Sequence, residues 1–358
     1  MLILGGSVHH PGGLEAFCER AVAAINAHGH RWRAEWRTTD NAYLTARRLP
    51  RAFKRLMQSF WLARRYDVVW LQWSTLADLL FVIAMRVRRV PVIVTPHLGG
   101  NARLQRVRIL RDAARRLLGL ADRLALLFAA QAEELSLPRD VPKVTVRSFL
   151  PQAALQVGGA GARSGALRII HAGRLSEAKG SFRAIALCAA LHTHGYPVSA
   201  TIVGRADPAT MRQLHDAADQ AGLRQSIDFV EWLDETRLIA AYEQSDVLVH
   251  LSMIDSYPLV VLEAMARGVV PVVGPMAGAA SMVAQYGGYV AEDPMVEAAA
   301  TWILQRPVQQ LREYGTSIAA FVRADFAWNV CGERIIALAE EVRGSTAAHV
   351  PLKRRDVA

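Results

Sequence analysis

The segment that decides the fold is residues 246–268, DVLVHLSMIDSYPLVVLEAMARG. It begins with an apolar, β-branched run that is typical of a buried strand, passes through a short loop, and continues as a helical pattern from Pro258 to Gly268. The same order of strand, loop and helix recurs along the chain, and this is the sequence form of a parallel sheet covered by helices on both faces. We therefore expect an α/β protein built from doubly wound sheets.

Two such sheets are expected, one in each half of the chain. The strands of the first half are predicted at residues 2–4, 67–71, 91–95, 123–127 and 143–147. Those of the second half are predicted at residues 167–172, 198–203, 226–230, 246–251, 269–273 and 288–291. The Gly-rich and Ala-rich residues 157–165 are poor in large side chains, which indicates a linker.

The predicted organisation follows from that linker. Residues 1–155 form a first Rossmann-like domain, residues 156–166 the linker and residues 167–327 a second Rossmann-like domain, followed by a closing helix over 328–343 and a tail over 344–358. In such folds ligands bind at the carboxyl ends of the strands, so the two domains are expected to face each other across a ligand-binding cleft.

Composition excludes several other classes of protein. The chain has 358 residues, 52% of them apolar, and three cysteines with no C-x-x-C pair, which excludes a disulfide scaffold and a zinc ribbon. The longest apolar run, residues 79–85, has seven residues, against about 20 needed to span a bilayer. No signal-peptide pattern begins the sequence. We expect a cytoplasmic protein, with the inner face of the plasma membrane as a peripheral location.

Charge is distributed unevenly along the chain. Residues 1–150 hold 24 Lys and Arg against 11 Asp and Glu, whereas the remaining residues hold 18 against 21. A basic half suggests an anionic partner, which can be a nucleic acid, an acidic membrane surface or a phosphorylated acceptor. Since only four residues are lysines, part of the arginine excess can also reflect genomic base composition.

Two cations follow the first strand of the second half. Residues 173–180 read GRLSEAKG, in which Arg174 offers a planar guanidinium fork and Lys179 a mobile point charge. Both lie at the carboxyl end of a strand, where a ligand with two phosphate groups would be held. The alternative is a pair of surface cations in a loop. The spacing of a Walker loop is absent.

Two carboxylates flank the start of the helix after residue 257. A helix N-terminus presents unpaired N–H groups that can hold a phosphate, here around Tyr257, Pro258, Leu259 and Val260. Asp255 precedes this point and Glu263 follows eight residues later, so that carboxylates suited to sugar and ribose hydroxyls flank a phosphate-sized site. The alternative is that Asp255 is a helix cap and Glu263 a solvated helix residue.

These motifs together resemble the nucleotide-sugar site of the GT-B glycosyltransferases of family 4, which are retaining enzymes with UDP-, GDP- or related sugar donors. The resemblance is carried by G-R-L-x-x-x-K-G at residues 173–180 and by the D-S-Y-P-L-V-x-x-E-A-M-A-x-G segment at 255–268. Weaker matches are the glycine loop PGGLE at 11–15, Thr95-Pro96-His97 and Glu231-Trp232-Leu233. The resemblance covers most of the chain and implies the GT-B fold.

The resemblance also implies roles for individual residues. Arg174 and Lys179 would neutralise the donor diphosphate, the backbone from Tyr257 to Val260 would cradle it, and Asp255 would face the donor sugar. The remaining donor-site residues implied are Gly12, Gly13, Gly173, Trp232, Leu233, Ser256 and Glu263, the last of these at the ribose, with His97 beside the transferred sugar. No metal or cofactor is implied, because the cations replace a metal as charge stabiliser.

Three segments depart from the family pattern. Asp255 and Ser256 stand where the family has glutamate and glycine, residues 204–207 (GRAD) replace a G-x-G motif, and residues 148–151 (SFLP) replace an N-G-V-D motif. These departures leave the choice of donor open, and a degenerate, non-catalytic site is the alternative to a working one.

Residues 51–65 form a basic amphipathic pattern. Arg51, Lys54 and Arg55 gather on one side with Arg65, and Phe53, Leu56, Met57 and Phe60 gather opposite. This predicts a helix that contacts an anionic membrane or the acceptor, with Arg103 and Arg106 adding to that contact. The alternative is that the apolar side packs on its own sheet and the basic side is solvated.

The function predicted from the sequence is transfer of a hexose from a nucleotide-diphosphate sugar to an acceptor. A glycan or a polyprenyl-diphosphate-linked acceptor is expected, in cell-surface polysaccharide or glycolipid synthesis, and no nucleic acid. Two alternatives stay open: a basic nucleic-acid-binding protein, and another GT-B enzyme such as an epimerase or phosphorylase.

Overall fold

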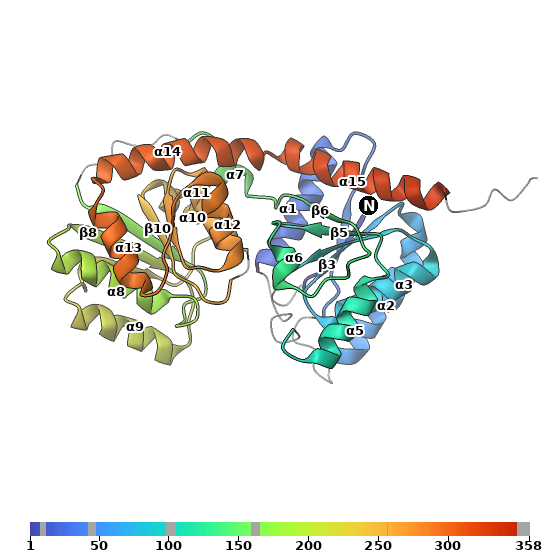
Figure 1. Cartoon of the computed structure of the whole chain (residues 1–358), viewed down its shortest axis with the longest axis horizontal. Helices are drawn as coiled ribbons and strands as arrows, with labels where there is room; N and C mark the ends of the chain where they lie inside the picture. The colour runs from blue at the N-terminus through green and yellow to red at the C-terminus, as the bar shows by residue number, and fades with distance from the viewer. Residues whose placement is uncertain (8–11, 42–47, 98–104, 159–164, 256, 349–358) are drawn as a thin grey trace, which may run out of the picture. The chain divides into compact units, whose positions relative to one another are not determined.

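The computed structural model describes residues 1–7, 12–41, 48–97, 105–158, 165–255 and 257–348 (Figure 1). It divides into two compact units. Unit 1 comprises Met1–Phe149 and Trp328–Ala358, and unit 2 comprises Leu150–Ala327. The division after residue 149 lies six residues before the first-domain end expected at 155.

Unit 1 is built on a six-stranded parallel sheet in the order β2-β1-β3-β4-β5-β6. Its strands are β1 (Leu2–Leu4), β2 (Glu35–Arg37), β3 (Val69–Trp73), β4 (Val92–Pro96), β5 (Arg123–Leu126) and β6 (Lys143–Thr145). Its helices are α1 (Gly13–His28), α2 (Leu49–Leu62), η2 (Ala63–Arg65), η3 (Leu76–Asp78), α3 (Leu79–Arg88), α5 (Arg108–Leu118), α6 (Gln131–Glu134) and α15 (Trp328–Ala348).

Unit 2 repeats this plan with a six-stranded parallel sheet in the order β12-β11-β10-β7-β8-β9. Its strands are β7 (Leu167–Ala172), β8 (Val198–Val203), β9 (Ile227–Val230), β10 (Val247–His250), β11 (Val270–Val273) and β12 (Tyr289–Val290). Its helices are α7 (Gln152–Leu155), α8 (Ser181–Thr193), α9 (Pro208–Gln220), α10 (Glu235–Glu243), α11 (Leu259–Ala266), α12 (Ala277–Tyr286), α13 (Met295–Leu304) and α14 (Val308–Asp325). The predicted doubly wound architecture is confirmed.

Most predicted strands lie within two residues of the observed ones, and the strand the sequence analysis missed is β2. All five residues of β3 are buried, as are all four of β10, and both strands are mainly apolar, with Gln72 and His250 as their polar residues. By contrast β2 is three residues long, forms the edge of its sheet and carries charged Glu35 and Arg37. Such a short, half-exposed strand has no apolar run to predict it.

The C-terminal helix α15 packs against α1 within unit 1. The indole N–H of Trp32 donates to Glu340 Oε1 at 3.2 Å, which fixes the helix beside the segment that enters β2. The helix continues through residues 344–348, which the sequence analysis placed in a tail, so the predicted helix end at 343 is wrong. Residues 349–358 lie outside the described residues.

A buried ion pair fixes the start of β10, the central strand that leads to the candidate site. Asp246 is buried, and Arg312 of α14 donates to it through Nε at 2.9 Å. The other carboxylate oxygen accepts from the backbone N–H of Arg168 in β7 at 3.0 Å. Shifting β7 against β10 would break these contacts and leave the buried charge of Asp246 uncompensated, which is costly. The contacts therefore hold the two strands in register.

Candidate functional site

The loop from β7 to α8 packs directly onto the carboxyl end of β10. Gly180 begins this contact with a left-handed backbone, φ +83°, and a Cβ there would lie 2.4 Å from the carbonyl oxygen of Leu251. Met253 N–H donates to Ala178 O at 2.9 Å. Arg183 of α8 donates from Nε to Leu251 O at 2.9 Å and from Nη2 to Glu177 O at 2.8 Å. The two predicted motifs are therefore held together as one structure.

A second close approach joins the ends of β7 and β8. A Cβ on Gly204 would lie 1.7 Å from the carbonyl oxygen of Gly173, so only glycine fits. Gly204 is the part of the family's G-x-G motif that this chain retains. Further along, Asp207 caps α9 by accepting from the backbone N–H groups of Ala209 and Thr210 at 3.0 and 2.9 Å. The departure over residues 204–207 thus builds a helix cap.

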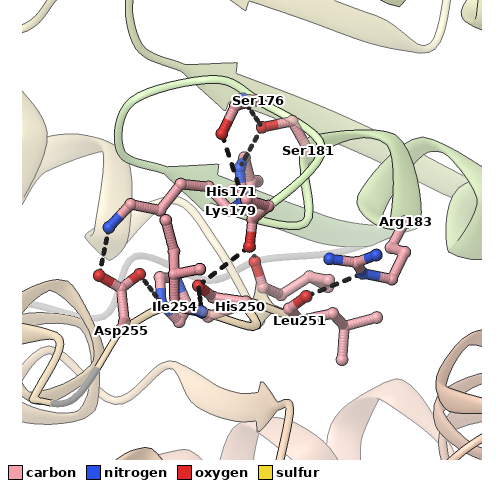
Figure 2. Close-up of polar contacts among 12 residues, drawn as sticks. His171, Ser176, Lys179, Ser181, Arg183, His250, Leu251, Ile254 and Asp255 are labelled. Carbon is pink, nitrogen blue, oxygen red and sulfur yellow. Dashed lines mark hydrogen bonds and ion pairs between the residues drawn. The ribbon is translucent and has the colours of Figure 1, made fainter. Parts of the chain in front are cut away.

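Asp255 lies between the side chains of Lys179 and His250 (Figure 2). Lys179 Nζ forms an ion pair with its Oδ1, and His250 Nε2 donates to its Oδ2 at 2.9 Å. Burial by itself would raise the pKa of Asp255, but the hydrogen bond from His250 and the charge of Lys179 outweigh it and hold that pKa well below its usual range. The carboxylate is therefore ionised and already partnered.

Behind this group lies a chain of hydrogen bonds through His171 (Figure 2). His171 Nδ1 lies 2.9 Å from the carbonyl oxygen of Val249, so Nδ1 carries the proton and Nε2 accepts from Ser181 Oγ at 3.0 Å. The Ser181 hydroxyl oxygen in turn accepts from the backbone N–H of Ser176 at 3.0 Å. His171 stacks on His250, with ring centroids 6.4 Å apart. This network fixes the loop of residues 173–180, which carries Arg174 and Lys179 and is named the cation loop.

Arg174 differs from Lys179 in being exposed. With the residues that the structure describes, it makes no hydrogen bond or ion pair. It follows Gly173, whose φ is +148°. An exposed guanidinium at the carboxyl edge of the sheet can meet an anion without first losing a partner. The loop thus presents one available cation and one paired cation.

Helix α11 begins with Pro258 as its N-cap and no side-chain cap. The alternative that Asp255 caps this helix is therefore wrong, because its oxygens bond Lys179 and His250 instead. Glu263 is buried on α11, so the alternative of a solvated residue is also wrong. Tyr257, Leu259 and Val260 are each half-buried at the start of the helix. Ser256 lies outside the described residues.

Trp232 and Leu233 follow β9 in unit 2. The Trp232 ring is exposed and lies beneath the guanidinium of Arg205, 5.8 Å from its centroid. Arg205 also pairs with Glu231 at 3.6 Å. Since an exposed surface pair adds little stability, this pair leaves the Trp232 ring accessible at the end of β9.

Gly12, Gly13 and His97 belong to unit 1. Gly12 is the N-cap of α1 and Gly13 its first residue. His97 follows β4, packs edge-on against Phe17 at 5.7 Å and lies 3.0 Å from Gln72 Oε1 through Nε2. Burial lowers the pKa of His97 to about 4, so its ring is neutral at physiological pH. Pro11 of the same motif lies outside the described residues.

The predicted basic helix forms as α2, but its faces differ from the prediction. Leu56 and Phe60 pack on the core, whereas Phe53 is exposed with Trp61, because Ala52 and Ser59 take the innermost positions. Arg51, Lys54 and Arg106 are exposed. Arg55 is half-buried and donates through Nε to Asp40 at 3.1 Å, which gives it a structural role. Arg103 lies outside the described residues.

Because the pKa values of His97 and His171 are lowered, we expect the free energy of unfolding to fall in mild acid. Burial lowers the pKa of each to about 4 from the usual 6.5. Between these values the unfolded chain binds more protons than the folded one, so stability falls as pH falls through this window, by roughly 3 kcal/mol per histidine. Urea unfolding at pH values above and below the window measures the loss. A His97→Gln, His171→Asn variant should lose less, and an identical loss in both proteins would contradict the assignment.

Over the described residues, no group of three or more His, Cys, Asp or Glu side chains is arranged to hold a metal ion. Within the same residues, no helix combines the length and apolarity needed to cross a bilayer.

The residues that form this site match a known protein family. Residues 159–312, which contain both halves of the site in unit 2, match the family described as Glycosyl transferases group 1. Within unit 2, these residues are similar to the group 1 glycosyltransferases. The chain is accordingly a glycosyltransferase, as the sequence analysis predicted. None of the curated proteins compared with it matches in sequence.

Solved structures extend the likeness to the whole chain. Sucrose-phosphate synthase from Thermosynechococcus elongatus is similar at a TM-score of 0.76 and 18% identity, with 96% of this chain and 99% of that one covered. HepE from Anabaena in complex with UDP gives 0.73 and 18%, covering 95% and 99%. The E. coli protein titled trehalose-6-phosphate, bound with UDP-2-fluoro glucose, gives 0.70 and 14%, also covering 95% and 99%. At such identities the likeness shows the GT-B fold.

The sequence analysis missed the residues that support the site. His250 was read only as part of an apolar strand, and His171, Ser181 and Arg183 were not considered. One signal was available: His250 and His171 are polar side chains in otherwise apolar runs, five residues before Asp255 and three before Arg174 respectively. A buried histidine in such a strand needs partners, and the adjacent loops are the nearest source.

Proposed function

We propose that this glycosyltransferase is a retaining enzyme that transfers a hexose from a nucleotide-diphosphate sugar to a glycan or lipid-linked acceptor in cell-surface polysaccharide or glycolipid synthesis. The observation that carries the donor assignment is the cation loop packed on the end of β10, with exposed Arg174 and paired Lys179 beside the ionised Asp255. Structural neighbours titled with UDP and with UDP-2-fluoro glucose support the class of donor.

The proposed chemistry depends on charge that develops at the leaving group. When the bond between the sugar and the diphosphate breaks, the diphosphate gains negative charge, and cations placed beside it stabilise the transition state. Arg174 would meet the diphosphate directly. Lys179 would first exchange part of its contact with Asp255 for a phosphate oxygen, which releases the carboxylate toward a hydroxyl of the donor sugar. His250 would keep its hydrogen bond to Asp255 during this exchange.

Binding of the donor gives the most direct test. A panel of UDP-, GDP- and ADP-sugars is screened for a rise in Tm, since a ligand at 100 times its Kd stabilises by about 2.7 kcal/mol. We expect one nucleotide to raise Tm by roughly 5 °C, with duplex DNA giving no rise. A rise with DNA and with no nucleotide sugar would contradict the proposal and favour a nucleic-acid-binding protein.

The acceptor and the reaction type need a second measurement. Incubation with the stabilising donor and a polyprenyl-diphosphate-linked glycan should release nucleoside diphosphate and lengthen the glycan by one sugar, with the anomeric configuration of the donor retained. Conversion of the donor without transfer to any acceptor would instead indicate an epimerase. A requirement for inorganic phosphate as acceptor would indicate a phosphorylase.

A further inference from the structure

Exposed apolar side chains are concentrated on three helices of unit 1. More than half of the large apolar side chains exposed in the described chain lie on α2, on α3 and at the start of α5: Leu49, Phe53, Trp61, Leu80, Ile83, Val87, Val107, Ile109 and Leu110. Several are strongly exposed, with 80% of Ile109, 69% of Trp61 and 62% of Phe53 accessible. A monomer rarely leaves so many apolar side chains exposed in one region without a partner.

These three helices form one continuous layer, which we name the α2–α3–α5 face. Helix α3 contacts both α2 and α5, and the three lie side by side in Figure 1. The Arg88 guanidinium of α3 lies 4.8 Å from the ring centroid of Phe60 and 5.4 Å from that of Trp61, which joins α3 to the end of α2.

The inward side of this layer is occupied by the core. Phe81, Val82 and Met85 of α3 and Ala114 and Leu118 of α5 are buried in the unit 1 core, with Leu56 and Phe60 of α2 packed against it. The outward apolar residues are therefore not needed to cover the sheet. Their spacing agrees: Leu80, Ile83 and Val87 recur at helical intervals on the side of α3 opposite the core.

Charge on the same helices indicates the chemistry of the partner. Helices α2, α3 and α5 together carry nine Arg and Lys residues and one acid, Asp112. Exposed cations among exposed apolar side chains match a surface that offers phosphates above hydrocarbon, which is an anionic bilayer. A nucleic acid would match the charge but would leave the apolar side chains in water. A protein partner would need a surface complementary in shape to the exposed side chains of three separate helices. Lipid acyl chains are fluid and can adapt to these side chains.

We propose that the α2–α3–α5 face lies on an anionic membrane, with Phe53, Trp61 and Ile109 entering the headgroup region and the surrounding arginines against lipid phosphates. The choice of a lipid surface rests in part on the proposed lipid-linked acceptor, so binding and transfer are measured separately. This surface is larger than the single helix predicted from the sequence. It also excludes Arg55 from the contact, because Arg55 is paired with Asp40.

Vesicle flotation with the full chain tests the proposal. We expect flotation with vesicles of phosphatidylcholine and phosphatidylglycerol, at least tenfold weaker flotation with phosphatidylcholine alone, and release as salt rises and shortens the Debye length. A Trp61→Ser, Ile109→Ser variant should bind at least tenfold more weakly. Phe321→Ser, an equally exposed apolar residue of α14 in unit 2, is the matched control and should bind as the parent does.

Charged and apolar contributions are separated by a second pair of variants. Lys54→Glu with Arg64→Glu should lower flotation while avoiding the Arg55–Asp40 pair. Brominated lipids should quench tryptophan fluorescence in the parent more than in Trp61→Phe. Absence of flotation, or flotation unchanged by the Trp61 and Ile109 substitutions, would overturn the proposal, as would tight binding to DNA in place of vesicles. The donor-induced rise in Tm reports on the proposed function independently, because it involves unit 2 and needs no membrane.

Discussion

Replacing Arg174 with alanine is expected to lower kcat about 100-fold or more, and Lys179→Ala to do the same, with a smaller change in donor KM. A cation beside the leaving diphosphate contributes most when the glycosidic bond is broken and the charge is largest. A 100-fold loss corresponds to about 2.7 kcal/mol of transition-state stabilisation. Initial rates of nucleoside diphosphate release over a range of donor concentrations measure both constants.

The structure makes the two variants unequal as tests. Arg174 is exposed and makes no hydrogen bond or ion pair with the described residues, so its replacement should leave Tm unchanged. Lys179→Ala leaves the half-buried Asp255 with His250 alone, so some loss of Tm is expected there. Arg174→Ala is therefore the decisive variant.

The matched control for Arg174→Ala is Arg212→Ala. Arg212 is an exposed arginine of α9 in the same unit, outside the proposed site, and its replacement should leave both constants as in the parent. If Arg174→Ala retains a kcat within about threefold of the parent, a difference below ~0.7 kcal/mol, the assignment of Arg174 to the diphosphate is wrong.

The sequence predicts the buried part of the fold closely. Strands β7 and β8 were predicted to the residue, because each is rich in apolar or β-branched side chains and is followed at once by a glycine, Gly173 or Gly204. The edge strand β2 could not be predicted in this way. The sequence analysis also placed Phe53 on the buried face of α2, whereas Phe53 is exposed. Periodicity shows which side of a helix is mainly apolar, but it does not show which apolar residue on that side the neighbouring helix leaves uncovered.

For the site, the sequence predicts where residues gather but not which of them pair. Loops that follow neighbouring parallel strands meet at one edge of a sheet, so the approach of Lys179 to Asp255 follows from β7 lying beside β10. The hydrogen bond from His250 does not follow. It depends on the path of the short loop from Leu251 to Ile254, and on Asp255 being one methylene shorter than the glutamate of the related motif.

Asp255→Ala is expected to depress kcat roughly 10- to 100-fold while changing donor KM less. A sugar without its carboxylate partner still binds through the nucleotide but seldom reaches the reactive geometry, which is a loss in turnover. The structure adds a second consequence. Because the substitution also removes the partner of Lys179, it leaves that cation available to the diphosphate. Donor affinity should therefore be unchanged or higher, as measured by titration of the donor.

Variants at His250 test whether the Asp255 carboxylate must be positioned, and variants at Asp255 test whether the carboxylate is needed at all. Gln at position 250 can still donate toward Asp255, whereas Leu cannot, so His250→Gln should retain more turnover than His250→Leu. Asp255→Glu brings an extra methylene beside His250 Nε2, which lies 2.9 Å from the present carboxylate, so the longer side chain must shift the carboxylate and transfer should be reduced but measurable. Transfer at the parent rate by Asp255→Ala would show that the carboxylate only anchors Lys179. In that case the sugar-facing role proposed for Asp255 is wrong, whatever the result at Arg174.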